Sequence, residues 1–207
     1  WLCERVGPGG SVLSLDVDTR FHCELPANGE VRECDATAEP LGEGAFDLVH
    51  ARAFLEHLHQ REAVLDAMVA ALAPGGWILV EDGDWGLYGL QEIPEPFRTL
   101  SLGAMDHAVK TMGMDPYAGR WLLPALRCRG LAACDAAGTV WTLHGGTPSA
   151  EWYVGGLARA KEALVGAGVV DAATADGVGA SLASMLIYIL MALVLAWRPR
   201  GLLPAHA

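Results

Sequence analysis

Four short segments that read as strands, each ending in a polar residue, recur in the first 85 residues and constrain the fold most strongly. They cover residues 11–16, 31–35, 46–50 and 77–81. Three of these segments, 11–16, 46–50 and 77–81, are mostly apolar and do not alternate regularly with polar residues. Such runs are typical of strands buried on both faces of a parallel sheet. The sequence therefore predicts an α/β fold with a doubly wound, mostly parallel sheet covered by helices.

A helix is expected between the third and fourth segments. Leu65, Met68, Val69 and Leu72 recur at the spacing of one amphipathic helix face. Pro74-Gly75-Gly76 follows at once, and we expect this turn sequence to end the helix.

The ends of the four predicted strands carry the polar residues of interest, which are Asp16, Asp35, His50 and the pair Glu81-Asp82. In open parallel sheets, ligands bind at the carboxyl ends of the strands. The sequence therefore predicts a ligand site where these side chains meet.

Composition excludes several classes of function. The net charge is −11, so the chain has no excess of basic residues that could neutralise a row of phosphates, and we expect no nucleic-acid partner. Five cysteines without a C-x-x-C pair argue against a disulfide framework or a cysteine-based metal site, and they fit a cytoplasmic protein. A small-molecule substrate is the expected partner, and the oligomeric state is left open.

The second half of the chain is expected to be more helical, over residues 94–126, 150–167 and 171–184, with one further strand at 139–143. We expect a single domain, with residues 1–85 as a cofactor-binding core and 86–207 as substrate-side helices and C-terminal strands. Residues 178–197 form an uncharged run that is long enough for a membrane span, and a core strand at 191–197 is the alternative.

The expected phosphate or cofactor loop is missing from the sequence. In nucleotide-binding sheets, a glycine-rich loop lies about 20 residues before the strand-end acid that holds a ribose. Counting back from Asp16 places that loop before residue 1, and no G-x-G-x-x-G follows a predicted strand. We therefore expect residues 1–6 to be the tail of a first helix, with the first strand and its loop absent.

Four groups of residues carry a resemblance to a known family. They are Gly7-Pro8-Gly9-Gly10 leading to Leu15-Asp16, then Glu33-Cys34-Asp35-Ala36, then Phe46-Asp47-Leu48-Val49-His50 with Leu55-Glu56-His57-Leu58, and finally Pro74-Gly75-Gly76-Trp77 with Glu81-Asp82. In this order they resemble the class I S-adenosylmethionine-dependent methyltransferases, and most closely the bacterial small-molecule enzymes related to the ubiquinone and menaquinone type.

The resemblance implies S-adenosyl-L-methionine as cofactor and assigns five residues to it. Asp16 would accept hydrogen bonds from the ribose hydroxyls, and Val17 would pack against the adenine. Asp35 would accept from the adenine amino group, with the Ala36 N–H nearby. His50 would line the methionine moiety and face the substrate.

Arg52 and His57 would border the substrate pocket, and no general base is assigned. The resemblance also favours the strand over the membrane span at the C-terminal end. Without the glycine-rich loop and the first strand, which is central in this family, we expect impaired cofactor binding and marginal folding.

Three alternatives stay open beside methyl transfer to a small molecule. They are a non-catalytic relic or binding module, a protein tethered to a membrane through 178–197, and an oxidoreductase on a dinucleotide-binding sheet. Asp35 and Pro74-Gly75-Gly76 match the order of these features in the methyltransferases that the chain resembles, which disfavours the oxidoreductase.

Overall fold

The structure is a computed structural model that describes residues 1–86, 95, 97–140, 144, 146–173 and 175–176. The chain forms two compact units. The first consists of residues 1–83 and 118–134, and the second of residues 84–117 and 135–207. The residues predicted to form the site lie in the first unit.

The first unit begins with a helix that packs on a pair of parallel strands. Its elements are α1 (Leu2–Val6), β1 (Val12–Asp16), the 3-10 helix η1 (Thr19–Phe21) and β2 (Gly29–Glu33). The Asn28 side-chain amide ties α1 to the strands by donating hydrogen bonds to the carbonyls of Cys3 and Gly7, at 2.9 and 3.0 Å. Gly29 has room for no side chain, because an added Cβ would lie 2.9 Å from the Cys3 sulfur. Residues 2–6 are helical, as predicted; that they are the tail of a helix that follows a missing strand and loop stays a prediction.

A second pair of parallel strands follows, with a helix between them. Its elements are β3 (Phe46–Arg52), the 3-10 helix η2 (Leu55–His57), α2 (Arg61–Ala70) and β4 (Leu72–Glu81). All four strands predicted from the sequence are therefore present. Their parallel pairing confirms the α/β class, although they form two two-stranded sheets, β1–β2 and β3–β4.

The prediction that Pro74-Gly75-Gly76 ends the helix is wrong. α2 ends at Ala70, and these three residues lie inside β4, where the pairing with β3 is irregular. Gly75 adopts a left-handed φ of 84°, and a Cβ on Gly76 would lie 2.9 Å from the Phe46 carbonyl oxygen. The glycines therefore allow the two strands to approach closely. Leu72 keeps the helical spacing in sequence but pairs with Phe46 as a strand residue.

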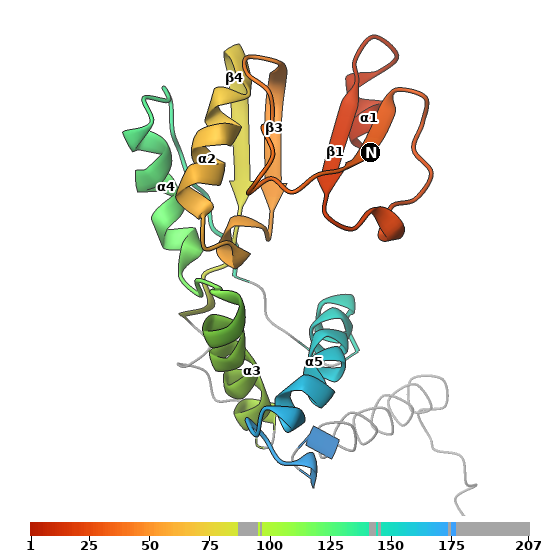
Figure 1. The fold of residues 1–207 in the computed structure, drawn as a ribbon, viewed down its shortest axis with the longest axis vertical. Helices are drawn as coiled ribbons and strands as arrows, with labels where there is room; N and C mark the ends of the chain where they lie inside the picture. Colours follow the sequence, from red (N-terminus) through yellow and green to blue (C-terminus); the bar gives the residue numbers. More distant parts are fainter. Residues whose placement is uncertain (87–94, 96, 141–143, 145, 174, 177–207) are drawn as a thin grey trace, which may run out of the picture. The chain divides into compact units, whose positions relative to one another are not determined.

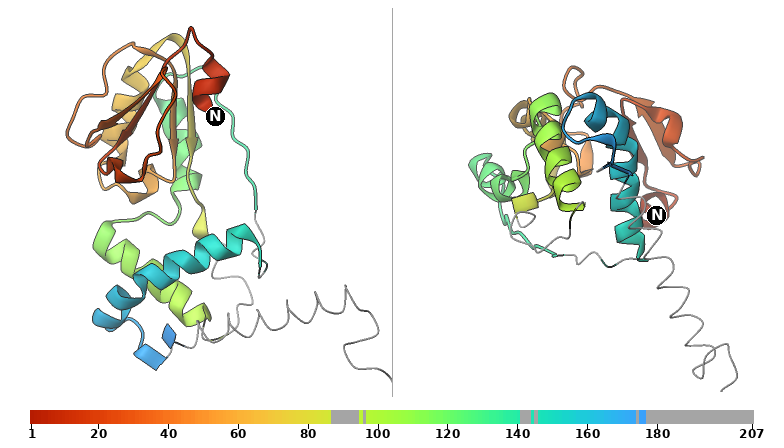
Figure 2. Two further views of the ribbon diagram at one scale, coloured as in Figure 1. Left: turned by 90° about the vertical axis from the view of Figure 1, so that its right-hand side faces the viewer. Right: turned by 90° about the horizontal axis from the view of Figure 1, so that it is seen from below.

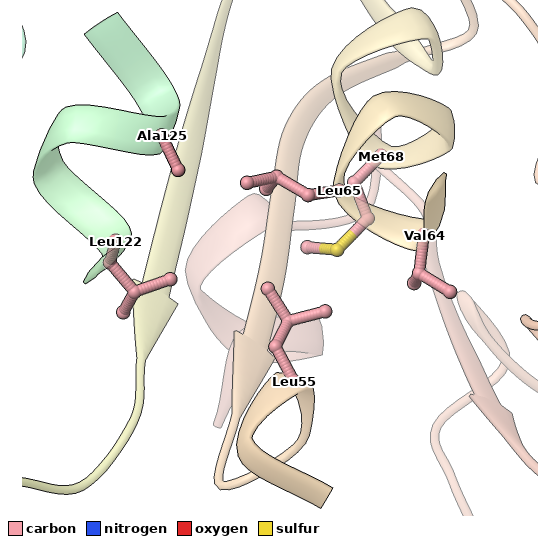
Figure 3. Close-up of a cluster of buried hydrophobic side chains, with 6 residues drawn as sticks. All are labelled: Leu55, Val64, Leu65, Met68, Leu122 and Ala125. Carbon is pink, nitrogen blue, oxygen red and sulfur yellow. The ribbon is translucent and has the colours of Figure 1, made fainter. Parts of the chain in front are cut away.

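The main core lies on one face of the β3–β4 sheet. α2 and α4 (Ala118–Cys128) contribute to a cluster of buried side chains shown in Figure 3, consisting of Leu55, Val64, Leu65, Met68, Leu122 and Ala125. The strand side chains that pack against this cluster are Val49, Ala51, Ile78 and Val80.

Within the described residues, the opposite face of β3–β4 is exposed, so the predicted burial of both strand faces is not found there. Leu48, Trp77 and Leu79 point to this face, and Trp77 is 68% exposed. The alternation of half-buried and exposed residues along β4 shows the same one-sided cover. These three apolar side chains therefore remain exposed to solvent within the described part of the chain.

An arginine just after α4 fixes that helix to α2. The Arg129 guanidinium donates to Glu62 Oε2 and Asp66 Oδ1, both at 2.7 Å, and its side chain is 13% exposed. It also donates to the Ala125 and Glu62 carbonyls. This guanidinium holds the pKa of the Glu62 carboxyl below its usual range.

Replacing Arg129 with methionine is expected to lower the free energy of unfolding of the first unit by about 1–2 kcal/mol, because charge-assisted hydrogen bonds are lost while the aliphatic stem is kept. Urea unfolding followed by circular dichroism measures the change. Arg127→Met is the matched control, since Arg127 is exposed in the last turn of α4. Equal losses in both variants would contradict this role of Arg129.

The second unit contains a pair of packed helices, α3 (Phe97–Met112) and α5 (Pro148–Gly166), which cross each other in Figure 2. Their core consists of Leu100, Leu157, Leu164, Val170 and Ala175. The helices predicted for 94–126 and 150–167 thus correspond to α3, α4 and α5.

The remaining predictions for the second half fall partly outside the described residues. Thr139 and Val140 are not in a strand, and 141–143 lie outside the description. Of the helix predicted at 171–184, residues 172–173 and 175–176 are helical. The segment 178–197 lies wholly outside the described residues. Within the described part of the chain, no helix combines the length and apolarity that a membrane span requires.

Candidate functional site

The carboxyl ends of β1 and β2 bring two of the predicted residues together. The Cys34 N–H donates to the Asp16 carbonyl at 3.0 Å, which places the segment leading to Asp35 beside the end of β1. Asp16 Oδ1 accepts from the Asp18 N–H at 2.9 Å, and Oδ2 lies 3.9 Å from His22 Nε2. The Asp16 side chain is half exposed, so its oxygens are open to further hydrogen-bond donors. Val17 follows with an exposed apolar side chain.

Asp35 is held as an ionised acceptor. The Thr37 hydroxyl and N–H both donate to Asp35 Oδ1, at 2.6 and 2.9 Å, and these bonds hold the pKa of the carboxyl below its ordinary value. Among the described residues, none donates a hydrogen bond to the second oxygen, Oδ2. Ala36 packs against the main core and so anchors this segment.

The ends of β3 and β4 bring together a second pair of residues. His50 Nε2 lies 2.8 Å from Glu81 Oε1, and both side chains are partly exposed. Arg52 pairs in register with Glu81. Since alternate residues of a strand share a face, His50 and Arg52 lie on the face of the sheet that α2 and α4 do not cover.

The turn after β3 is strained and held by the end of β4. Ala53 adopts a left-handed φ of 47°, which costs free energy in a residue with a side chain. Its N–H donates to the Glu81 carbonyl at 2.8 Å, and the Phe54 N–H donates to Asp82 Oδ1 at 2.9 Å. Such strain persists where surrounding contacts fix the backbone, and it is typical of functional sites.

Sequence reasoning gave no role to Glu56, which is 2% exposed. Its Oε2 accepts from the Gly83 N–H at 2.7 Å, and its Oε1 lies 3.4 Å from His57 Nε2. His57 Nδ1 and Asp82 Oδ2 are buried without a hydrogen-bond partner. A glutamate between Leu55 and Leu58, just beyond a strand end, was the only signal in the sequence for this buried carboxylate.

Burial raises the pKa of the Asp82 carboxyl, and the nearby Glu56 charge adds to the effect. An acid whose pKa is raised by folding binds its proton more tightly in the folded state, so stability falls as the pH rises from its ordinary pKa through the raised value. We expect Asp82→Asn to remove this part of the loss of stability as the pH rises above about 4, the ordinary pKa of an aspartate.

Urea unfolding at several pH values tests this expectation. Asp47→Asn is the control, because Asp47 is an exposed carboxyl near the amino end of β3. If the wild-type and Asp82→Asn proteins lose stability equally across this range, Asp82 does not contribute in this way.

The structure thus gathers the predicted residues in two groups, Asp16 with Asp35 and His50 with Glu81. β1, β3 and β4 point in the same direction in Figure 1, so both groups lie at the same end of the strands. His57 is at the end of η2, on the segment held by Asp82 and Gly83. In the described part of the chain, no three His, Cys, Asp or Glu side chains converge to bind a metal ion.

Comparison with known proteins shows that the N-terminal part of the chain is similar to methyltransferases. Residues 2–80 match a family model described as "Methyltransferase domain". The chain is 31% identical over 125 residues to "Methyltransferase str2" of Strobilurus tenacellus, which covers 59% of this chain and 45% of that protein. It is 34% identical over 90 residues to "Methyltransferase str3" of the same organism, covering 42% and 32% of the two chains. The chain thus spans less than half the length of these curated relatives.

Proposed function

Because residues 2–80 match the methyltransferase domain model and part of the chain is similar to two methyltransferases, we propose that the protein is a class I methyltransferase that transfers a methyl group from S-adenosylmethionine to a small-molecule acceptor. The observation that carries the proposal is the placement of Asp16 and Asp35 side by side, as exposed acceptors at the ends of two parallel strands.

The residues at this edge fit the cofactor. A ribose presents two neighbouring hydroxyls, and an ionised carboxylate such as that of Asp16 can accept from both. Asp35 keeps an acceptor oxygen for an amino group, because Thr37 engages only its Oδ1. Val17 directly follows Asp16 in the sequence. Its side chain is apolar and exposed, which suits packing against the face of an adenine ring.

The cofactor would supply a methyl group on a positively charged sulfur, which is a good leaving group. The protein therefore has to hold the acceptor at reacting distance and in line, and to exclude competing groups. Arg52 and His57 border the same end of β3 and are proposed to line the acceptor pocket. The acidic edge favours binding of a cofactor that carries positive charge.

Impaired binding is part of the proposal. The sequence has no G-x-G-x-x-G after a predicted strand, so we expect Asp16 and Asp35 to provide most of the contacts to the cofactor. We expect a dissociation constant for S-adenosylmethionine between about 10 μM and 1 mM.

Titration calorimetry with S-adenosylmethionine, followed by detection of S-adenosylhomocysteine in the presence of candidate acceptors, tests the proposal. Saturable binding with product formation is the expected result. Saturable binding without product from any acceptor would favour a non-catalytic binding module. Absence of binding up to several millimolar would overturn the proposal.

A further inference from the structure

His50 and Glu81 form a side-chain pair that the sequence-based assignment of His50 to the cofactor does not explain. The two residues are 31 positions apart, and the pairing of β3 with β4 brings Nε2 and Oε1 to 2.8 Å. From this contact we propose that His50, oriented by Glu81, is the general base that removes a proton from a phenolic or enolic hydroxyl of the acceptor. The inference rests on the proposed methyl transfer.

The contact fixes which nitrogen of the imidazole carries the proton. A carboxylate oxygen can only accept a hydrogen bond, so Nε2 of neutral His50 must donate. The other nitrogen, Nδ1, then has the free electron pair that accepts a proton. When His50 takes up that proton, the Glu81 carboxylate stabilises the positive charge that forms on the ring.

The location of the pair supports a role in chemistry over a role in folding. Partly exposed ion pairs contribute little to stability, and this pair is partly exposed on the side of the sheet that α2 and α4 leave uncovered. It lies at the carboxyl ends of two parallel strands, next to the strained Ala53 turn. Asp16 and Asp35 lie at the carboxyl ends of the other strand pair, β1–β2, and β1 points the same way as β3 and β4 in Figure 1. A substrate between the proposed cofactor and the β3–β4 pair would therefore meet His50.

The base selects the class of acceptor. A histidine is suited to a hydroxyl on unsaturated carbon, whose pKa of about 10 lies within reach of an imidazole. A carboxylic acid is already ionised at neutral pH, and an amine reacts through its own electron pair, so neither needs this base before attack.

In the proposed step, His50 acts as the base while the acceptor oxygen attacks the methyl group. The acceptor O–H bond breaks and its proton moves to His50 Nδ1, while the oxygen electron pair forms a bond to the methyl carbon. The carbon–sulfur bond of the methyl donor breaks, and its electron pair stays on sulfur. His50 returns its proton to solvent before the next turnover.

The first test uses nuclear magnetic resonance of the 207-residue protein without cofactor. In a long-range proton–nitrogen spectrum at alkaline pH, neutral His50 of the wild type should show a single tautomer with the proton on Nε2. Glu81→Ala should give a mixture of both tautomers. The same mixture in both proteins, or a proton on Nδ1 in the wild type, would overturn the orienting role of Glu81.

The second test compares two acceptors, phenol and the more acidic 4-nitrophenol, at saturating S-adenosylmethionine. His50→Gln should lower kcat with phenol by about 100-fold or more. It should lower kcat with 4-nitrophenol far less, because that acceptor ionises without help. His59→Gln is the matched control, since His59 is exposed nearby and lies outside the site. Equal losses with the two acceptors would overturn the assignment of His50 as a base.

Calorimetry separates a failure of this inference from a failure of the proposed function. If His50→Gln binds S-adenosylmethionine as the wild type does, a loss of kcat belongs to the proton transfer; if its binding is lost, His50 is a cofactor residue and not the base. A wild type that binds the cofactor but methylates neither phenol contradicts the acceptor class alone. A wild type that binds no cofactor contradicts the proposed function.

Discussion

Asp16→Asn is expected to weaken S-adenosylmethionine binding at least tenfold while leaving the fold intact. The carboxylate can accept two charge-assisted hydrogen bonds, each of which contributes about 1.5–3 kcal/mol, whereas an amide keeps a single uncharged acceptor. A loss of about 1.4 kcal/mol corresponds to a factor of ten in the dissociation constant. Titration calorimetry under the conditions used for the wild type measures the change.

Asp47→Asn provides the control for Asp16→Asn. Both substitutions remove one negative charge from the same unit, but Asp47 lies near the amino end of β3, away from the strand ends that carry the predicted site. Its effect therefore reports the change in net charge alone. If both variants bind the cofactor equally well, Asp16 is not a ribose ligand.

The sequence predicted the strands well because their signal is local. β1, β3 and β4 each contain a short, mostly apolar run that ends at or next to a polar side chain, whereas β2 (Gly29–Glu33) is mostly charged. The cover of those strands was not predictable in the same way. An apolar residue such as Trp77 indicates that burying its side chain would be favourable. Only the tertiary structure shows which face of the strand is covered by helices, and Trp77 lies on the uncovered face.

The helix end shows how a local pattern can mislead. Leu72 continues the spacing of α2, yet hydrogen bonding with β3 begins at this residue and takes it into β4. Pro74-Gly75-Gly76 is a typical helix terminator, but its glycines allow the close approach of Gly76 to the Phe46 carbonyl. Pairing between distant segments outweighed the local preference.

The candidate site likewise combines residues that local sequence signals indicate with contacts that depend on tertiary structure. Asp16, Asp35 and His50 could be found because each stands at the end of a recognisable strand. The contact between His50 and Glu81 depends on strand register, and the burial of Glu56 depends on the Gly83 N–H, which is 27 residues away. The strand ends predicted that His50 and Glu81 lie near one another, but neither their direct contact nor the burial of Glu56 follows from a motif or a spacing. The predicted absence of a first strand and of a glycine-rich loop stays a prediction.

Leu65→Ala is expected to cause the largest loss of stability, about 2–5 kcal/mol. Leu65 is fully buried at 0% exposure in the cluster that joins α2 to η2 and α4. Removing three carbons there loses the free energy of their transfer from water and leaves a cavity that the rigid strands cannot fill. Urea unfolding followed by circular dichroism, with thermal unfolding in parallel, measures the loss.

Leu79→Ala is the matched control, because it deletes the same atoms from a side chain that is 50% exposed on the uncovered face of β4. A largely solvated leucine has less apolar surface to lose and leaves no enclosed cavity, so its expected cost is within about 1 kcal/mol. A cost as large as that of Leu65→Ala would mean that the face bearing Leu48, Trp77 and Leu79 is buried in solution, and the one-sided core would then be wrong. A small cost at Leu79 together with a large one at Leu65 places the stability of this unit in the layer between β3–β4 and its two helices, away from the edge where Asp16 and His50 are proposed to act.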